Sequence, residues 1–271
     1  MTKENPPKDS SSTLLVQISD THLCADPHRS LRGINTHHCL KAVFNLASSH
    51  LQQASLIVVT GDISHDGSSE SYCFLEDRLR NQSGMKRLLP GNHDQFETLC
   101  QVMPQPTWPT VDQLGSWLLI GLDSHLKGES AGCLDSDQLV DLEFILANNA
   151  SQPVLVALHH PPIPTGSLWM DEISLINQVE FRQLLIKYSQ VRAVIFGHAH
   201  QEMDETHYGI RWLCCPSTCV QFLPNTDSAY SDTRLPGYRW LRLYHDGKLE
   251  TGVERISEWP PSNGPDRRKW S

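Results

Sequence analysis

The chain has 271 residues, 39% of them hydrophobic, and a formal net charge of −9 at pH 7. A chain of this length can bury the core of a single domain. Its acidic balance argues against a broad nucleic-acid surface, because such a surface neutralises phosphates with clustered Lys and Arg. The one basic run, residues 267–269, lies in a polar end that contains Pro and Gly, and we interpret it as solvated charge.

Membrane insertion and export are also disfavoured by the sequence. No stretch approaches the ~20 apolar residues that cross a bilayer, and residues 1–12 lack the apolar segment of a secretion signal. The eight cysteines are irregularly spaced in a chain that does not need disulfides. Cys214, Cys215 and Cys219 have no second Cys pair nearby that would complete a zinc site. We therefore expect a cytoplasmic protein with reduced thiols and no membrane partner.

Apolar runs alternate with amphipathic stretches in the first third of the chain. Residues 14–19 predict a strand, residues 35–52 a helix and residues 56–60 a second strand, which is the pattern of a βαβ unit. Residues 68–80 then predict a helix, and residues 86–89 a short strand.

The middle of the chain continues this alternation. Residues 117–123 predict a strand, residues 136–148 a helix capped by Asp135 or Ser136, and residues 154–158 and 191–196 two further strands. After His200 the pattern changes to short strands joined by turns, with a hairpin turn at 245–248, and the expected strands are 210–215, 218–222, 238–244 and 249–256. A mixed second sheet is implied. We expect one α/β domain, residues 13–256, between polar tails at 1–12 and 257–271.

Five predicted strands end in residues that bind hard or borderline metals. These are Asp20 and His22, Asp62 after Gly61, Asn92-His93-Asp94 after Gly91, His159-His160, and His198 and His200 after Gly197. Asp-x-His and Gly-Asp are weak signals alone, because Asp and Gly are common in turns. Imidazole is the commonest ligand of Zn, Mn and Fe, so Gly-His-x-His is more specific. Ligands gather beyond the carboxyl ends of strands in an α/β sheet, and the joint occurrence therefore predicts a two-metal phosphoesterase site.

This set of motifs resembles the calcineurin-like metallophosphoesterase superfamily over about residues 14–252. Within it, the chain is similar to the bacterial class III 3′,5′-cyclic AMP phosphodiesterases in residues 17–23, 33–36, 89–94, 169–171 and 216–222. The resemblance implies two mixed β-sheets packed as a sandwich and flanked by helices, in a single domain.

The resemblance also implies a ligand set for two metal ions. One ion would be held by Asp20, His22 and His200, the other by Asn92, His159 and His198, with Asp62 bridging both. The choice of His159 over His160 follows the family pattern of His-x-Pro. The ions would be divalent or mixed-valence, with Fe or Mn favoured by the family, while Zn or Co also suit these donors.

The implied reaction is hydrolysis of 3′,5′-cyclic AMP to 5′-AMP, which lowers cellular cyclic AMP. A hydroxide bridging both metals would attack the phosphorus, and His93 would protonate the departing 3′ oxygen. His22 is placed with His93 in catalysis, and the residues expected to contact the substrate are His22, Asn92, His93 and His200. Asp94 either orients His93 or has a structural role.

Several alternatives stay open at this point. The same ligands would serve 2′,3′-cyclic nucleotides or glycerophosphodiesters, because discrimination lies in the surrounding loops. A nuclease would need a basic track, and a non-catalytic scaffold would be expected to have lost ligands. Trp169 and Phe222 either face the base or pack in the core, and the lone histidines His65, His125 and His207 are not included in the site. A small cyclic nucleotide is the expected partner, and the sequence does not indicate the oligomeric state.

Overall fold

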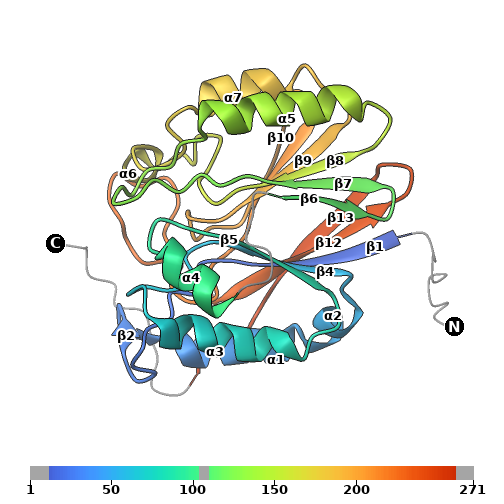
Figure 1. Ribbon diagram of the computed structural model, residues 1–271. Helices are drawn as coiled ribbons and strands as arrows, with labels where there is room; N and C mark the ends of the chain where they lie inside the picture. The colour runs from blue at the N-terminus through green and yellow to red at the C-terminus, as the bar shows by residue number, and fades with distance from the viewer. Residues whose placement is uncertain (1–11, 104–109, 261–271) are drawn as a thin grey trace, which may run out of the picture.

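Two mixed β-sheets face each other at the centre of the protein, and helices cover their outer faces (Figure 1). The computed structural model describes residues 12–103 and 110–260. The first sheet has the strand order β13 (Leu249–Arg255), β12 (Gly237–Tyr244), β1 (Ser12–Ile18), β4 (Leu56–Thr60) and β5 (Met85–Leu89). The second has the order β10 (Met203–His207), β11 (Ile210–Cys214), β9 (Val191–Phe196), β8 (Val154–Ala157), β7 (Trp117–Gly121) and β6 (Thr110–Leu114).

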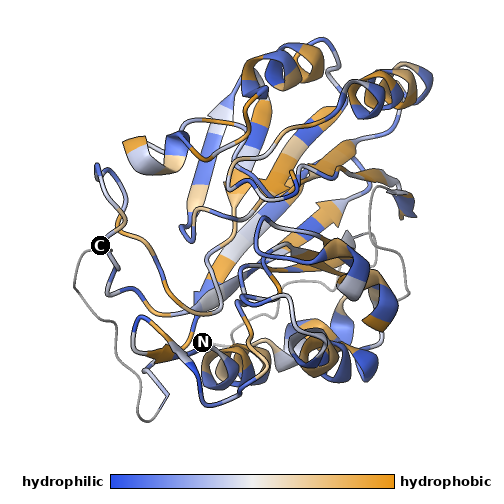
Figure 2. Cartoon of the chain, turned by 60° about the vertical axis from the view of Figure 1, so that its left-hand side comes forward, coloured by the Kyte–Doolittle hydropathy of each residue, from blue (hydrophilic) through white to orange (hydrophobic). Residues whose placement is uncertain are grey.

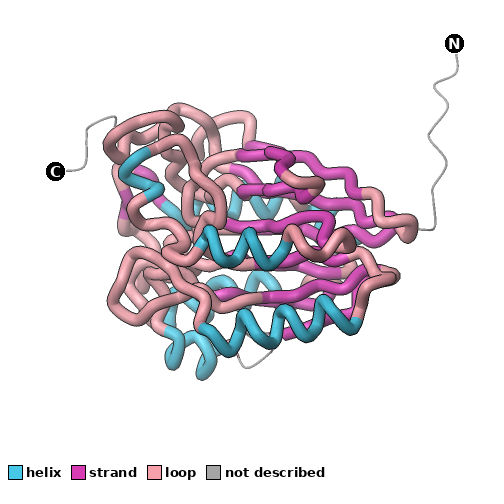
Figure 3. Tube along the Cα trace, turned by 90° about the horizontal axis from the view of Figure 1, so that it is seen from above, coloured by secondary structure: helices cyan, strands magenta, loops and turns pink. Residues whose placement is uncertain are grey.

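The central strands of both sheets are parallel. β1, β4 and β5 run in one direction in the first sheet, and β7, β8, β9 and β11 do so in the second. The antiparallel strands β12, β13, β6 and β10 complete the edges. Because neighbouring parallel strands share one carboxyl edge, the loops after them gather at one end of the sandwich, as Figure 3 shows from above.

Each outer face is closed by its own helices. α1 (Thr36–Leu46), α2 (Ser48–Gln53), α3 (Ser69–Arg80) and α4 (Phe96–Val102) accompany the first sheet, and α5 (Ser136–Asn148), α6 (Leu168–Asp171) and α7 (Gln178–Leu185) accompany the second. Figure 2 shows hydrophobic and hydrophilic residues alternating along these helices, which is expected when one face packs on a sheet. Three large apolar clusters result, one under each helical layer and one between the sheets.

These observations confirm the predicted α/β sandwich in a single domain and correct it locally. The expected helix at 35–52 is divided at Ala47 into α1 and α2, although the Leu51 N–H still donates to the Ala47 carbonyl. The expected strand at 218–222 is wrong. Ser217 Oγ accepts the Cys219 N–H and donates to the Asp20 carbonyl, so local side-chain bonds replace a strand ladder there.

Other elements were either confirmed or absent from the prediction. Asp135, not Ser136, caps α5 by accepting the Gln138 N–H, and the hairpin turn at 245–248 joins β12 to β13. The strands β6 and β10, the helices α4, α6 and α7, and the small hairpin β2 (Ser30–Leu31) and β3 (Ile34–Asn35) were not expected. The predicted tails lie largely outside the described residues. Within the described ranges, no helix is long and apolar enough to cross a bilayer.

Candidate metal centre and active site

All seven predicted metal ligands lie on loops at the carboxyl edge of the two sheets. These loops follow the parallel strands β1, β4, β5, β8 and β9, and we call their seven side chains the ligand cluster: Asp20, His22, Asp62, Asn92, His159, His198 and His200. The side chains of six are buried, and Asn92 is half-buried. Segments up to 180 residues apart in sequence therefore meet in one place.

The backbone at the ligand cluster is strained. Of the eight described non-glycine residues with positive φ, five belong to the cluster: Asp20 at 54°, His22 at 43°, Asp62 at 51°, His198 at 65° and His200 at 51°. A residue in this left-handed region costs roughly 1–2 kcal/mol and persists only where its surroundings determine it. Such strain is concentrated at functional sites, where it aims side chains in directions that regular structure does not allow.

Two motif glycines let the loops approach the ligands closely. A Cβ on Gly61 would lie 2.3 Å from Nδ1 of His159, and a Cβ on Gly91 would lie 2.2 Å from Oδ1 of Asp62. Both distances are far below van der Waals contact, and Gly61 also has a φ of +89°. The glycines that precede Asp62 and Asn92 are therefore required by the packing of one ligand loop on another.

Asp62 lies between two groups of ligands. Its Oδ2 is 3.5 Å from Nε2 of His22, and its Oδ1 is 3.5 Å from Nε2 of His159. On the first side, His22 Nε2 is 3.0 Å from His200 Nε2, and that nitrogen is 3.5 Å from Asp20 Oδ1. One carboxylate thus presents a separate oxygen to each group.

The second group is built around His159. Its Nε2 lies 3.4 Å from Asn92 Oδ1 and 3.3 Å from His198 Nδ1. His160 is adjacent, with its ring 4.8 Å from the rings of both His159 and His198, and its Nδ1 bonds with Ser124 Oγ at 2.9 Å. Proximity alone would admit His160 as a ligand, but the approach of Asp62 and Asn92 to His159 favours the latter.

Backbone carbonyls define which nitrogen two of the imidazoles offer. His159 Nδ1 lies 2.6 Å from the Thr60 carbonyl, and His200 Nδ1 lies 2.7 Å from the Val220 carbonyl. A carbonyl can only accept, so each Nδ1 carries a proton, and in the neutral imidazole Nε2 is the nitrogen left to offer a lone pair to the cluster. Metal-binding histidines are held by their second nitrogen in this way. The donor set and its orientation therefore fit metal ions.

Burial keeps three imidazoles of the cluster neutral. It lowers the pKa of His22 and His198 well below the ordinary value and lowers the pKa of His200 to about 4. Neutral imidazole is the form that binds metals. Burial acts in the opposite direction on Asp20, whose pKa it raises to about 7. A cation beside this carboxylate would reverse that effect, since an opposite charge favours the ionised form.

The Asp62–His159 pair attracts positive charge. Burial raises the pKa of Asp62, but the charge of His159 and its hydrogen bond outweigh burial and hold this pKa well below its ordinary value. Burial likewise lowers the pKa of His159, but the Asp62 carboxylate outweighs it and raises this pKa to about 9. Without a metal ion the pair binds a proton, and a bound cation would supply the same positive charge.

His93 lies at the edge of the cluster, outside the ligand set. It is exposed, its ring is 4.9 Å from the His22 ring, and its backbone N–H donates to Asp62 Oδ1 at 2.9 Å. Asp94 does not contact the His93 ring. Its buried carboxylate instead accepts from the N–H groups of Ile63, Ser64 and Gly91 and from the Tyr72 hydroxyl. Of the two roles considered for Asp94, the structure supports the structural one.

A pocket opens beside the ligand cluster and has one apolar side. His22, Asp62, Asn92, His93, His198 and His200 line it together with residues that we call the pocket wall, namely Leu31, Trp169, Ile173 and Phe222. The rings of Trp169 and Phe222 meet edge to face at 5.0 Å, and Phe222 stacks on His200 at 4.6 Å. The sequence alone does not predict Trp169 and Phe222 as site residues, because an aromatic residue is as often part of a core.

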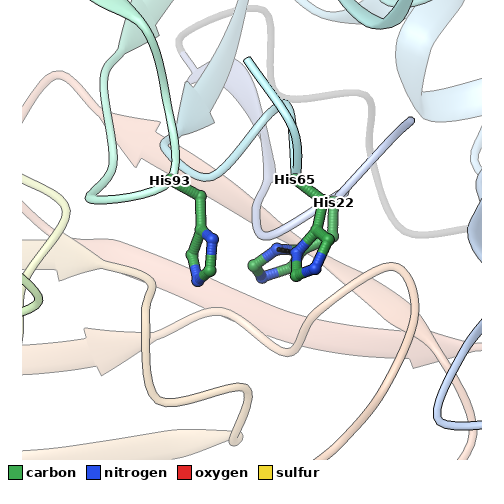
Figure 4. A group of neighbouring side chains, drawn as sticks. All are labelled: His22, His65 and His93. Carbon is green, nitrogen blue, oxygen red and sulfur yellow. Dashed lines mark hydrogen bonds between the residues drawn. The ribbon is translucent and has the colours of Figure 1, made fainter. Parts of the chain in front are cut away.

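His65 is a site residue that sequence reasoning missed. It lines the same pocket, its ring is stacked on His93 with centroids 5.0 Å apart, and it also contacts His22 (Figure 4). The sequence feature that indicates His65 as a site residue is its position three residues after Asp62, in the loop that follows β4. His125 and His207, the other histidines set aside, do not line this pocket.

Comparison with known proteins agrees with this geometry. The calcineurin-like phosphoesterase family matches residues 13–202, which include the whole ligand cluster. The chain belongs to the calcineurin-like phosphoesterase family. Among curated members, the 3′,5′-cyclic adenosine monophosphate phosphodiesterase CpdA of Pseudomonas aeruginosa is 38% identical, with 94% of each chain covered. The protein of the same name from Vibrio vulnificus is 36% identical, with 91% of each chain covered.

Solved structures show the same fold at low sequence identity. A dimetal phosphatase from Danio rerio superposes with a TM-score of 0.62 at 15% identity, covering 90% of this chain and 99% of that chain. Such a likeness shows the fold alone. The clustered His and Asp side chains of this calcineurin-like phosphoesterase fit a site for two metal ions.

Proposed function

We propose that this protein hydrolyses 3′,5′-cyclic AMP to 5′-AMP and thereby lowers the cyclic AMP concentration of the cell. The position of Asp62 supports the proposed reaction type, because its two oxygens face two separate groups of ligands and a carboxylate placed in this way suits a two-metal hydrolase. The substrate is argued from the relatives that bear this activity in their names. Their similarity spans over 90% of the chain and so extends past residue 202 into the segment of Val220 and Phe222.

The proposed metal assignment follows the two groups of the ligand cluster. One ion would be held by Asp20, His22 and His200, the second by Asn92, His159 and His198, and both by Asp62. We propose Fe or Mn, and the donor set also accepts Zn or Co, because it contains carboxylate, amide and imidazole ligands without a thiolate. When bound, the ions supply Lewis-acid chemistry: they stabilise negative charge on the phosphoryl oxygens and make water a nucleophile at neutral pH.

His93 is the proposed general acid. It is exposed in the pocket and lies against His22, so its ring is accessible to a substrate at the cluster. As the cyclic diester opens, the ring would donate a proton to the departing 3′ oxygen. The hydrogen bond from its backbone N–H to Asp62 fixes the loop that carries it. We propose that His22, Asn92, His93 and His200, which all line the pocket, contact the phosphate side of the substrate.

We propose that the pocket wall binds the adenine base. Trp169 and Phe222 offer aromatic surface, and Leu31 and Ile173 extend it with aliphatic groups. A nucleobase has a flat apolar face that stacks on such rings. The ligand cluster on one side and the wall on the other match a substrate with a phosphodiester at one end and a base at the other.

The deciding experiment is product identification with the full-length protein reconstituted with Mn²⁺ and incubated with cyclic AMP. The expected product on chromatography is 5′-AMP. Formation of 3′-AMP would show that the other ester bond is cleaved. Cyclic GMP, 2′,3′-cyclic AMP and glycerophosphocholine are tested under the same conditions, and faster turnover of any of these would overturn cyclic AMP as the proposed substrate.

We also propose the cytoplasm as the site of action. All eight cysteines of the chain fall within the described residues, and all are free thiols. Free thiols at this number are usual where glutathione and thioredoxin keep proteins reduced. A cytoplasmic fraction that lacks the protein, with the protein found in an exported fraction, would contradict this assignment.

A further inference from the structure

Within the described residues, the side chain of His65 contacts Nδ1 of His22, whereas backbone carbonyls contact Nδ1 of two other cluster imidazoles. His159 and His200 point Nδ1 at the carbonyls of Thr60 and Val220, at 2.6 and 2.7 Å. His22 Nδ1 instead lies 3.4 Å from Nδ1 of His65. The contact is longer than the two carbonyl bonds, so His22 is the least tightly held of the three rings.

The orientation of His22 determines what His65 must do. Its Nε2 faces the cluster, 3.5 Å from Asp62 Oδ2 and 3.0 Å from His200 Nε2. A neutral imidazole that gives Nε2 to a metal carries its proton on Nδ1. That proton needs an acceptor, because the His22 ring is buried. The only described atom at hydrogen-bond distance from His22 Nδ1 is Nδ1 of His65.

We propose that His65 is a positioning residue, whose Nδ1 accepts the Nδ1 proton of His22 and thereby holds His22 in the tautomer and orientation needed for metal binding. This inference rests on the metal role of His22 in the proposed function. The acceptor comes from a side chain, whereas Thr60 and Val220 use backbone atoms. His65 is therefore the point at which the orientation of a ligand can be changed by substitution.

The surroundings of His65 place it inside the site and argue against an unrelated surface role. Its ring lies nearly parallel to the His93 ring, at 24° and 5.0 Å, and meets the His22 ring edge on at 5.4 Å (Figure 4). All three rings line the pocket. A shift of His65 would therefore reach both a metal ligand and the proposed general acid.

A third metal ion held by His22, His65 and His93 is the competing interpretation, since their nitrogens lie within 4.8 Å of one another. It is disfavoured by the orientation of His22. With Nε2 committed to the cluster, binding a further cation through Nδ1 would need both ring nitrogens deprotonated. The trio also contains no carboxylate to offset the added charge. A hydrogen bond from His22 to His65 needs neither a fully deprotonated His22 ring nor a nearby carboxylate.

The test compares two substitutions of similar shape in the full-length protein. In Asn, Oδ1 occupies nearly the position of the imidazole Nδ1 and can accept the His22 proton, whereas Leu has the same branching without an acceptor. The variants are therefore His65→Asn and His65→Leu, with His207→Ala as the control, because His207 is an exposed residue on β10 paired with Glu205. Mn²⁺ affinity is measured by chelator competition, and the number of bound ions by elemental analysis.

We expect His65→Leu to weaken binding of one of two Mn²⁺ ions by about 10- to 100-fold, the usual effect of removing such a partner. His65→Asn should stay within about threefold of wild type, and His207→Ala should be unchanged. Thermal unfolding in chelator should coincide for all variants, which separates metal binding from folding. In His65→Leu, turnover of cyclic AMP should recover as Mn²⁺ is raised.

Three outcomes would overturn the proposal. Wild-type affinity in His65→Leu would show that the contact is not needed. Equal weakening in His65→Asn and His65→Leu would assign the effect to the ring itself and not to its acceptor. Loss of a third bound ion would make His65 a ligand. The binding titration uses no substrate, so a wild-type protein that binds two ions but does not cleave cyclic AMP would contradict the proposed function while leaving this inference standing.

Discussion

The ligand cluster and the pocket wall lie side by side but are held in different ways. The cluster residues follow parallel strands, and five of the seven have a positive φ. Their side chains contact each other and, for His159 and His200, backbone carbonyls. The wall comes from short or irregular segments, with Leu31 in a two-residue strand, Trp169 in a four-residue helix, and Phe222 in a loop. Its members meet through ring and apolar contacts.

This difference separates chemistry from specificity. Hydrogen bonds and strain leave the cluster few alternative arrangements, as a metal site needs if its ligands are to stay within about 0.5 Å of their positions. Apolar contacts on loops can change without disturbing the sheets. Function depends on the site and not on the fold, so the chemistry of the cluster and the substrate preference of the wall are separate properties of this site. Substitutions on the two sides should accordingly affect different kinetic constants.

Asp62→Ala should have the largest effect, because it removes the carboxylate shared by both groups of ligands. We expect turnover of cyclic AMP to fall by more than about 10³-fold, as the several kcal/mol supplied by the metals are lost. Elemental analysis should show less than one tightly bound ion per chain. Asp246→Asn, in the exposed hairpin turn between β12 and β13, is the control. Two tightly bound ions in Asp62→Ala would refute its bridging position.

His93→Gln tests a residue that lines the pocket but belongs to neither the ligand cluster nor the pocket wall. We expect kcat for cyclic AMP to fall by about 10²- to 10³-fold, since general acid catalysis contributes effects of this order, while metal content stays at the wild-type value. Bis(p-nitrophenyl) phosphate provides an internal comparison. Its leaving group departs without protonation, so its kcat should fall far less. An equal loss on both substrates would rule out proton donation as the role of His93.

Asp94→Ala should lower stability without a change in the identity of the ligands. It leaves three backbone N–H groups and the Tyr72 hydroxyl without their acceptor. We expect the free energy of unfolding in chelator to fall by about 3 kcal/mol in urea titrations. Tyr72→Phe removes one of these four bonds and also the acceptor of the Gln95 N–H, so it should cost about 2 kcal/mol. If Asp94→Ala unfolded at the wild-type urea concentration, Asp94 would not join the loops of Asp62 and Asn92 as described.

The sequence predicted that the side chains of the ligand cluster converge, but it did not predict the residues around them, for a physical reason. Asp20, Asp62, Asn92 and the histidines follow strands whose apolar pattern is visible in the sequence, so their convergence follows from the topology of parallel strands. His65 and Phe222 join the site through loop conformations that no periodic pattern encodes. The incorrectly predicted strand at 218–222 shows this most directly. Ser217 bonds to Cys219 and also to Asp20, which is almost 200 positions away in the sequence.

The edge elements were missed for a related reason. β10 has four exposed residues of five, and β6 alternates without a strongly apolar face, so each is a strand because a neighbour offers hydrogen bonds. The division at Ala47 has no sequence signal either, because Ala favours helices. The central strands, in contrast, are buried on both faces and read as continuous apolar runs.

Trp169→Leu should have the smallest effect on activity and decides whether the two regions are separable. Trp169 contacts Phe222 in the pocket wall, lies in α6 and is not a member of the ligand cluster. Loss of a stacking surface costs about 1–2 kcal/mol, so KM for cyclic AMP should rise roughly 5- to 30-fold with kcat and metal content nearly constant. A loss of bound metal in Trp169→Leu would mean that the wall helps to hold the cluster, through the stack of Phe222 on His200, and that chemistry and specificity are not independent in this protein.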